Sequence, residues 1–358
     1  MSIPQEVLFD EPFEPDSTRV EPSGSARAGN PRLTSAAYYG RKVLAAVISF
    51  FVTLVIGFVL FHLMPSDPVQ AMTRGRPTSD AQMEELRRQL GLDQPIWKQF
   101  VDYVSDVLHG DLGFSWQFKE PVSELIASHL WPTILLMGTA TIVSITIGLW
   151  MGIRSGWNHG SIFDRVSSGV SLTLWSVPTF WLGLLLLVIF TVGLGPIPSL
   201  FPAGGMSNPT VEPGWPHIVD VARHLVLPAA TLVLGDYALY VSIMRSSLID
   251  EMGSPYLLTA RAKGLFDSEV RRKHAVPNAL LPTVTVIFLS IGGIVSGAVT
   301  VETVFSWPGL GYLTYQALKV PDLPLLQGTF IVFSAVVIIM NLAADILYRF
   351  LDPRVRAQ

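Results

Sequence analysis

Between two long apolar segments lies the charged stretch Ser254-Pro-Tyr-Leu-Leu-Thr-Ala-Arg-Ala-Lys-Gly-Leu-Phe-Asp-Ser-Glu-Val-Arg-Arg-Lys-His-Ala-Val-Pro-Asn278. Ser254 is a favourable N-cap residue, and Pro255 suits the first helical position because its missing N–H needs no partner there. No helix-breaking residue follows until Gly264, which can adopt the left-handed conformation that ends a helix. The first half of the stretch therefore predicts a short helix.

The second half of the stretch predicts another helix. Asp267 is a favourable N-cap, and Glu269 follows in the first turn. Four basic residues come later, an order that suits the helix dipole: Arg271, Arg272, Lys273 and His274. Pro277 is expected to stop this helix. The whole stretch is predicted to be a helix–glycine–helix element that lies in water between two membrane spans.

These features alone allow two interpretations of the element. It can be a rigid surface that a soluble partner grips, or an ordinary basic cytoplasmic loop of a membrane protein. Both interpretations place it outside the bilayer, and neither identifies a partner.

The composition indicates an integral membrane protein. Half of the 358 residues are hydrophobic and only 15% are charged, whereas about a quarter of a soluble domain is charged. The net charge of −4 offers no polycationic surface for nucleic acid. The chain has no cysteine, which excludes disulfides, thiolate metal sites and cysteine nucleophiles.

Six apolar runs are each long enough to cross the roughly 30 Å of a bilayer as a helix. They cover residues 43–64, 131–153, 169–194, 226–244, 281–301 and 328–350. The fold class is therefore an all-α integral membrane protein with six transmembrane helices. Residues 1–42 are rich in Glu, Pro, Ser and Gly and are expected to form a disordered tail, and residues 351–358 a short C-terminal tail.

The distribution of Lys and Arg predicts the orientation. Basic residues flank the first span on its N-terminal side, follow the sixth span and fill the loop 245–280, whereas the short loops on the opposite side hold only Arg223 and Lys319. By the positive-inside rule both termini and the loop 245–280 are cytoplasmic. The loop 65–130 then lies outside the cytoplasm.

The loop 65–130 is predicted to be a helical extracytoplasmic insertion. Ser79 and Gln82 have the spacing of a capping box, before an apolar face with Met83, and Gly91 would end that helix. A second amphipathic stretch follows Pro95, with an apolar face formed by Trp97, Phe100, Val101, Val104 and Leu108. The insertion is either a docking surface, with its two helices packed together, or a plain spacer.

The sequence contains little that supports catalysis. It has no Gly-rich phosphate-binding loop with the Lys-Ser/Thr ending and no His pair at metal-binding spacing, so neither an ATPase site nor a metal site is expected. Asp236 lies inside the fourth span, one turn before Tyr240. A carboxylate at that depth faces a cavity or a partner, which can be a substrate amino group, a metal ion, a tyrosine hydroxyl or a neighbouring helix. Asp236, Tyr240 and Trp175 are candidate pathway residues.

The charged stretch also resembles a known family. Leu258-Thr259-Ala260, then Gly264, and His274-Ala275-Val276-Pro277 after nine further residues resemble the Glu-Ala-Ala…Gly…Ile-x-Leu-Pro loop of permease subunits of binding-protein-dependent ABC importers. Leu258 replaces the family Glu, His274 the Ile and Val276 the Leu. Thr-Ala-Arg-Ala-Lys-Gly-Leu is similar to the dipeptide/oligopeptide/nickel branch, as are Pro65-Ser-Asp-Pro68 and Trp307-Pro-Gly-Leu-Gly311.

The resemblance implies the type I importer fold in a bacterial plasma (inner) membrane. Such a permease pairs with a second permease subunit, two ABC ATPase subunits that bind ATP and Mg, and an extracytoplasmic substrate-binding protein. It is not itself an enzyme and binds no cofactor. The implied cargo is a di- or oligopeptide, with nickel complexes or glutathione-like molecules as alternatives. The resemblance implies a coupling helix at about residues 254–264, seated in a groove of the ATPase. The implied ATPase-coupling residues are Ser254, Pro255, Tyr256, Leu258, Thr259, Ala260, Arg261, Ala262, Lys263, Gly264, His274 and Pro277.

Two alternatives of other classes remain. An ion-coupled secondary transporter or channel would need an intramembrane ion relay or discontinuous spans in inverted repeats, whereas the sequence has one central carboxylate and no visible repeat. The second alternative is a receptor or assembly scaffold. Dependence of transport on ATP and on an external binding protein distinguishes the three classes.

Overall fold

The computed structural model describes residues 31–63, 69, 79–89, 91–193, 198–294 and 298–351. The expectations for residues 1–30, for the Pro65–Pro68 string and for the tail after Leu351 lie outside these ranges. The chain divides into two units, residues 1–41 and 42–358. The described part of the first unit is the beginning of helix α1, which starts at Pro31, inside the segment expected to be a tail.

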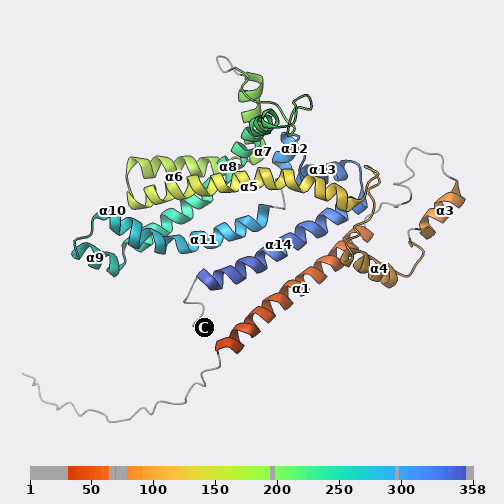
Figure 1. Cartoon of the computed structure of the whole chain (residues 1–358), viewed down its shortest axis with the longest axis horizontal. Helices are drawn as coiled ribbons and strands as arrows, with labels where there is room; N and C mark the ends of the chain where they lie inside the picture. Colours follow the sequence, from red (N-terminus) through yellow and green to blue (C-terminus); the bar gives the residue numbers. More distant parts are fainter. Residues whose placement is uncertain are drawn as a thin grey trace, which may run out of the picture. The chain divides into compact units, whose positions relative to one another are not determined.

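The described residues are helical, apart from turns, connecting segments and one isolated bridge between Phe114 and Pro121. Figure 1 shows the helices in chain order: α1 (Pro31–Leu63), α3 (Asp80–Gln89), α4 (Ile96–Leu108), α5 (Val122–Trp157), α6 (Ile162–Trp175), α7 (Thr179–Leu187) with the π-helix η1 (Val188–Gly193), α8 (Trp215–Met252), α9 (Pro255–Ala262), α10 (Asp267–Val270) with the π-helix η2 (Arg271–Ala275), α11 (Val276–Gly293), α12 (Val299–Val304), α13 (Leu310–Lys319) and α14 (Leu323–Leu351).

The first, second, fourth and sixth predicted spans correspond to helices longer than the apolar runs: α1, α5, α8 and α14. The fifth run, 281–301, was placed too late in the chain, because α11 ends at Gly293 and α12 begins only at Val299. Five helices in the described residues are long and apolar enough to cross a membrane, and a sixth crossing is counted if α6 and α7–η1 form one bent span. The bend is 98°, and Figure 1 shows α7 turning away from the line of α6. Pro178 explains the break, because it lacks a backbone N–H and disfavours helical geometry at Val177. The apolar run predicted one continuous helix for the third span, whereas the structure has two helices, α6 and α7, separated by a break.

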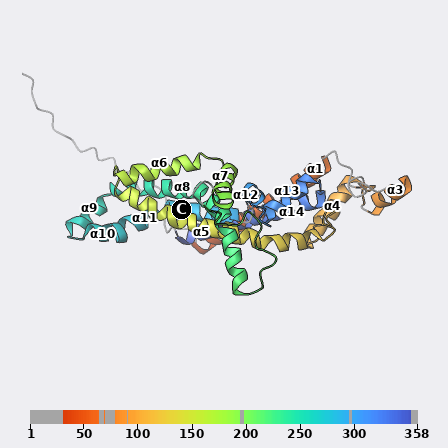
Figure 2. The same cartoon turned by 90° about the horizontal axis from the view of Figure 1, so that it is seen from above.

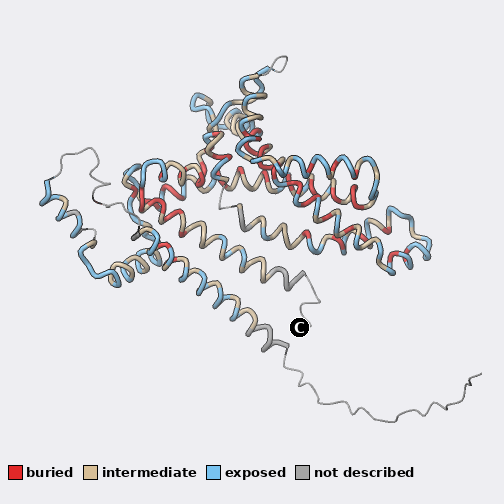
Figure 3. The backbone as a smooth tube through the Cα atoms, turned by 180° about the vertical axis from the view of Figure 1, so that it is seen from behind, coloured by how far each residue is buried: buried red, intermediate tan, exposed pale blue. Residues whose placement is uncertain are grey.

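Helices α5 and α8 run parallel and in close contact through a line of glycines. A Cβ atom at Gly148 would lie 2.5 Å from Cβ of Tyr240, and one at Gly152 would lie 2.8 Å from Cβ of Met244. Small residues at intervals of four allow helix backbones to approach closely in a membrane. Figure 3 shows buried residues concentrated along these helices, whereas α1 is mostly exposed or intermediate.

The insertion after α1 has the predicted helix ends. Ser79 and Gln82 form the capping box, with Ser79 N donating to Gln82 Oε1 at 3.2 Å and Gln82 N donating to Ser79 Oγ at 3.4 Å. Gly91 has a φ of +66° after α3. On α4, Phe100 packs against Phe58 of α1 with ring centroids 5.2 Å apart. Thus α4 rests on α1, rather than on α3 as one interpretation proposed.

Two ends of the unit 42–358 recur below. The α9 end comprises α9, α10, the turn 158–161 between α5 and α6, and the first turn of α6 with Asp164. The α13 end comprises α4, α12, α13 and the segment 111–122. Figures 1 and 2 both place α9 and α10 at one end of the helical bundle and α4 and α13 toward the other.

A buried carboxylate organises the α13 end. Glu302 is 0% exposed and accepts hydrogen bonds from Thr133 Oγ1 at 3.1 Å and from Tyr312 N at 2.9 Å. A Cβ atom at Gly309 would lie 2.4 Å from the Glu302 carboxylate. Glycine at this position therefore allows the turn before α13 to close over the acid.

Candidate functional site

Helix α9 begins and ends where the sequence predicts. Pro255 occupies the first turn and Ser254 the N-cap position. Ser254 does not cap through its side chain; its Oγ instead donates to Glu251 Oε1 at 3.4 Å. After α9, Gly264 has a φ of +82°, a conformation that favours glycine.

The second helix of the charged stretch differs from the prediction in two ways. Phe266, not Asp267, is the N-cap of α10, and the helix does not stop at Pro277. In a continuous α-helix the Pro277 ring would collide with the carbonyl of Lys273. The π-helical turn Arg271–Ala275 changes the bonding there, so Pro277 lies in the first turn of α11, where no N–H is required. The element is therefore continuous with α11 instead of separated from it.

One face of α9 is buried against the ends of the membrane helices. Leu257 and Ala260 are 0% and 6% exposed. They pack in one cluster, which we call the α9 seat, with Met244, Leu248, Val270, Ala275 and Ala279, and with partly buried residues that include Ile153 and Trp157 of α5. Ala260, which the sequence placed on the coupling helix, thus belongs to its buried face.

The opposite face of α9 is exposed. Leu258 is 65% exposed, and Phe266, between α9 and α10, is 77% exposed. The other exposed residues among those predicted for coupling are Pro255, Tyr256, Thr259, Arg261, Ala262, Lys263, Gly264 and Pro277, and His274 is intermediate. This face combines apolar and basic side chains.

Tyr256 joins three helices at the α9 end. Its hydroxyl donates to Glu251 of α8 and accepts from Asn278 Nδ2 of α11 at 2.9 Å. Asn278 Nδ2 also donates to the carbonyl of His274 at 3.0 Å. Burial and the Glu251 carboxylate raise the pKa of Tyr256. The hydroxyl therefore stays protonated and can keep donating to Glu251.

Trp157, the last residue of α5, forms cation–π contacts with two arginines of the charged stretch. The guanidinium carbon of Arg261 lies 5.9 Å from the Trp157 ring centroid and that of Arg271 lies 6.0 Å away. Such cation–π contacts contribute roughly 0.5–1 kcal/mol at exposed sites. Arg261 Nε also bonds Asp267 Oδ1 at 3.1 Å. These contacts hold α9 and α10 against the end of α5.

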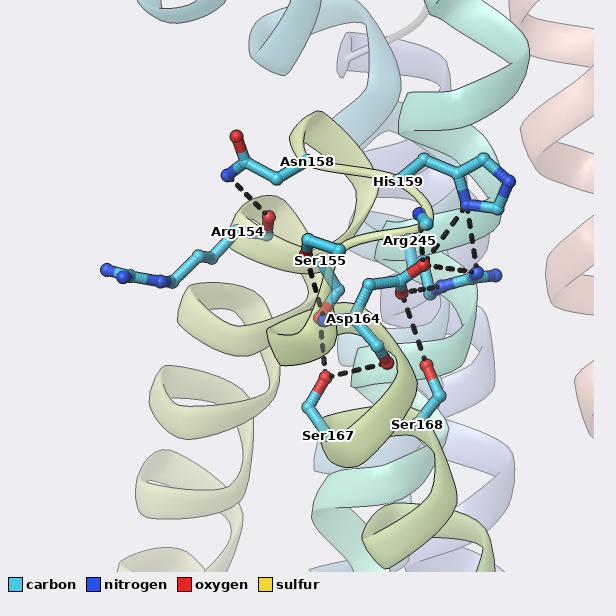
Figure 4. Close-up of polar contacts among 10 residues, drawn as sticks. Arg154, Ser155, Asn158, His159, Asp164, Ser167, Ser168 and Arg245 are labelled. Carbon is cyan, nitrogen blue, oxygen red and sulfur yellow. Dashed lines mark hydrogen bonds and ion pairs between the residues drawn. The ribbon is translucent and has the colours of Figure 1, made fainter.

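A buried ion pair ties the α5–α6 turn to α8. The Asp164 carboxylate, on a side chain 2% exposed, accepts hydrogen bonds from Arg245 Nε at 2.5 Å and from Arg245 Nη2 at 2.9 Å. Figure 4 shows Arg245, His159 and Ser168 converging on this carboxylate. Gly160 N donates to Asp164 Oδ2 at 2.9 Å, and His159 Nδ1 lies 3.1 Å from the same oxygen. We call this cluster the Asp164 brace; the sequence analysis used Arg245 only as an orientation signal and missed it.

A line of polar residues runs along the exposed side of α8. Asp236, Ser242, Ser246 and Asp250 are exposed and lie within one side of the helix at 3.6 residues per turn. The buried side carries Tyr240, Met244 and Leu248, with Tyr240 3% exposed. Asp236 and Tyr240 are one turn apart and differ in burial rather than in helix face, and Trp175, 59% exposed, ends α6. We call the four exposed polar residues the α8 polar stripe.

The comparisons with known proteins agree with a membrane-spanning transport subunit. A family model described as the binding-protein-dependent transport system inner membrane component matches residues 144–357, and a model for the N-terminal part of such components matches residues 37–137. The chain belongs to this family of inner membrane components of binding-protein-dependent transport systems.

Several relatives match most of the chain. The dipeptide transport system permease protein DppB of Escherichia coli K12 is 36% identical over 332 residues, which is 88% of this chain and 97% of the relative. A putative peptide permease of Brucella suis biovar 1 is 40% identical over 84% of this chain and 92% of its own. The glutathione transport system permease protein GsiC of E. coli K12 is 34% identical over 89% of this chain and 98% of its own.

A solved structure supports the fold. A crystal structure of the MetNI methionine ABC transporter in inward-facing conformations matches 64% of this chain and 96% of its own chain, with a TM-score of 0.50 and 18% identity. The chain is thus a multi-pass inner membrane protein and a permease subunit of a binding-protein-dependent ABC importer. Permeases of this family have no ATPase activity and bind no cofactor themselves.

Proposed function

We propose that this chain forms half of the translocation pathway of an ATP-driven peptide importer, with α9 as the coupling helix that seats in a groove of an ABC ATPase. The observation that carries the proposal is the α9 seat: one face of a short helix is fixed to α5, α8 and α11, and the other is exposed. In this arrangement the α9 end and both termini are cytoplasmic, as the Lys and Arg distribution predicts.

The contacts of α9 explain how force would reach the membrane helices. Tyr256 links α9 to α8 and α11, and the arginines on Trp157 link it to α5. The Asp164 brace joins α8 to the α5–α6 turn. A displacement of α9 by closing ATPases would therefore move these helices together, and nucleotide would shift the transporter between states through its different affinity for each.

The α8 polar stripe supports a pathway on this side of the helix. An ionised residue at the bilayer centre costs roughly 2.5–3.5 kcal/mol on insertion scales, so such residues face a cavity or a protein partner. Asp236 and the serines would then face the space shared with a second permease subunit, with Trp175 near the break of the third span. Tyr240 packs behind the stripe against α5.

Peptides are the proposed cargo because the relatives described above are named for dipeptide, peptide and glutathione transport. The Asp236 carboxylate is suited to the amino group that such molecules share. Nickel complexes and glutathione-like molecules remain the alternatives within the class. Uptake of labelled dipeptides, oligopeptides, glutathione and nickel by the complete transporter separates these substrates.

A crosslinking experiment tests the coupling helix. The chain has no native cysteine, so Leu258→Cys introduces its single thiol on the exposed face of α9. A thiol-linked photocrosslinker at this site is expected to capture the ABC ATPase in the assembled complex. The matched control is Leu318→Cys on α13, which is 58% exposed. Equal capture at both sites, or capture at neither, would contradict the proposal.

A transport assay tests whether the protein belongs to an ATP-driven importer or is a secondary transporter. In proteoliposomes that contain both permeases and both ATPases, uptake is expected to require ATP and the external binding protein. Uptake driven by an ion gradient without ATP would instead support a secondary transporter.

A further inference from the structure

A cavity of about 340 Å³ lies between α4 and the beginning of α14. Three carboxylates from α4 and the following segment line it: Asp102, Asp106 and Asp111. Its wall also contains Tyr103 and Trp116. The lining residues include no Lys, Arg or His, so the cavity has a net negative charge in the part of the chain that the structure describes.

Helix α4 has an apolar side and an acidic side, and the acidic side faces this cavity. Phe100 packs on α1. Trp97 and Leu108 are 68% and 69% exposed and lie on the side of α4 opposite Asp102 and Asp106, at 3.6 residues per turn. An amphipathic helix of this kind lies in the membrane interface with its apolar side toward the lipid. The carboxylates of the cavity therefore face away from the hydrocarbon.

The acidic groups have few partners within the protein. The carboxylates of Asp102 and Asp106 form no ion pair or hydrogen bond with any residue that the structure describes, whereas Asp111 Oδ1 accepts from Gly113 N at 2.9 Å. The hydroxyl of Tyr103 is buried and lies near the side chain of Gln327 in the cavity wall. Carboxylates next to aromatic rings are suited to a cation, which gains charge-assisted hydrogen bonds and cation–π contacts.

The walls of the cavity are held in place. Ser115 Oγ donates to Asp322 Oδ2 at 2.6 Å, and Gln117 N donates to the same oxygen at 3.0 Å. Asp322, just before α14, is 0% exposed. A Cβ atom at Gly328 would lie 2.5 Å from Val122, so α14 and α5 are also in close contact here. These contacts fix the segment 111–122 to α14, and the cavity is largely preformed.

We propose that this cavity receives a basic side chain, a lysine or an arginine, of the external binding protein when that protein docks on the permease. The inference rests on the proposed function, because it needs an importer with the α13 end outside the cytoplasm. A side chain carried by a docking protein fits an open, negatively charged cavity on the outer side of an interfacial helix. A metal ion fits less well, because the described residues contain no group of three His, Asp or Glu side chains close enough to hold one.

The test compares two doubly substituted permeases in the complete transporter in nanodiscs. Asp102→Asn with Asp106→Asn removes two charges from the cavity. Asp80→Asn with Asp93→Asn removes two charges from exposed positions of the same insertion that do not line it. Affinity for the purified, substrate-loaded binding protein is measured at several salt concentrations. The ATPase rate without binding protein serves as the check on folding and is expected to stay unchanged.

The cavity variant is expected to bind about tenfold more weakly than the control variant and to show a flatter dependence on salt. At saturating concentrations of the binding protein, stimulation of the ATPase rate in the cavity variant should equal that in the control variant. Equal affinities for the two variants would overturn the proposal. So would a cavity-specific loss of bound divalent cation, measured with calcium or magnesium alone. Stimulation of the unsubstituted complex by the binding protein reports separately on the proposed function.

A crosslink identifies the occupant. Asp106→Cys, joined through a short thiol–amine reagent, is expected to capture a lysine of the purified binding protein. Asp93→Cys should capture none or a different one. Capture of the same lysine from both positions would argue for a flexible contact and against the cavity.

Discussion

Both ends of the unit 42–358 are built around a buried carboxylate, and the two acids are stabilised in opposite ways. At the α9 end, Asp164 is paired with the Arg245 guanidinium through two hydrogen bonds. At the α13 end, Glu302 accepts from a hydroxyl and a backbone N–H, and no cation among the described residues reaches it. Burial accordingly raises the pKa of Glu302.

The difference suits the two ends to different tasks. A two-point ion pair holds two helices in one relative position and keeps its charge, as a part that transmits force requires. A carboxylate held only by neutral dipoles fixes a local turn and can take up a proton. The predictions below test this contrast, in order of decreasing expected effect.

The largest effect is expected from Ala260→Glu. Ala260 lies in the α9 seat beside Met244 and Leu248, so the new carboxylate would be buried without a partner. An uncompensated buried charge destabilises by about 3–5 kcal/mol, and α9 should leave its seat while the spans remain inserted. ATP-dependent peptide uptake by the reconstituted transporter is expected to fall at least about tenfold.

The matched control is Ala262→Glu, because Ala262 is exposed on the same short helix. It should leave insertion and the thermal stability of the permease unchanged. Normal uptake and unchanged stability in Ala260→Glu would show that the buried face of α9 does not hold the coupling element.

Asp164→Asn should produce the second largest effect. Arg245 would lose its carboxylate partner while its side chain stays only 27% exposed, and breaking such a buried pair costs about 3 kcal/mol. The thermal unfolding temperature of the purified permease should drop, and uptake should fall relative to ATP hydrolysis because the α5–α6 turn no longer follows α8.

Asp267→Asn provides the comparison at the same end. Its partner Arg261 also lies within hydrogen-bond distance, but the Asp267 side chain is 67% exposed. Exposed pairs contribute about 0–1 kcal/mol. If the two substitutions lower the unfolding temperature equally, the Asp164 brace has no special role.

Gly311→Ala tests the turn around Glu302. A Cβ atom at Gly311 would lie 2.8 Å from Cα of Val299 and 2.9 Å from Glu302 Oε2. Overpacking of this kind costs about 1–3 kcal/mol, and the α13 end should become more sensitive to limited proteolysis. Gly138→Ala in α5 is the control, because a Cβ there meets nothing within 4 Å. Equal protease resistance of both variants would contradict the close packing.

The sequence predicted the features that depend on neighbouring residues. Pro255 and Gly264 mark the ends of α9, and Ser79 with Gln82 forms the capping box of α3, because each signal lies within a few residues of the group that it satisfies. The apolar runs likewise located the membrane helices. Pro277 was predicted to end a helix, but the helix continues because the π-helical turn before Pro277 removes the expected clash of its ring with a backbone carbonyl.

The site features that sequence could not supply depend on distant contacts. Asp164 and Arg245 are 81 residues apart, and the side of α8 that Asp236 occupies depends on the packing of α5. A signal for that packing was present in the four-residue spacing of Gly148, Gly152 and Gly156, which is typical of close helix pairs. The spacing does not identify which helix packs against these glycines.

The smallest effect is expected from pH acting on Glu302. Because burial raises its pKa in the folded protein above the ordinary value of 4.5, the folded state holds the proton over a range where the unfolded state has released it. Stability at the α13 end is therefore highest below pH 4.5 and declines as pH rises toward the folded pKa. Glu302→Gln should flatten this decline in the thermal unfolding temperature, because the amide does not titrate. Glu124→Gln, at an exposed position of α5, should leave the pH profile unchanged. A Glu302→Gln profile that follows the unsubstituted protein would show that the acid stays ionised, and the contrast with Asp164 would then rest on geometry alone.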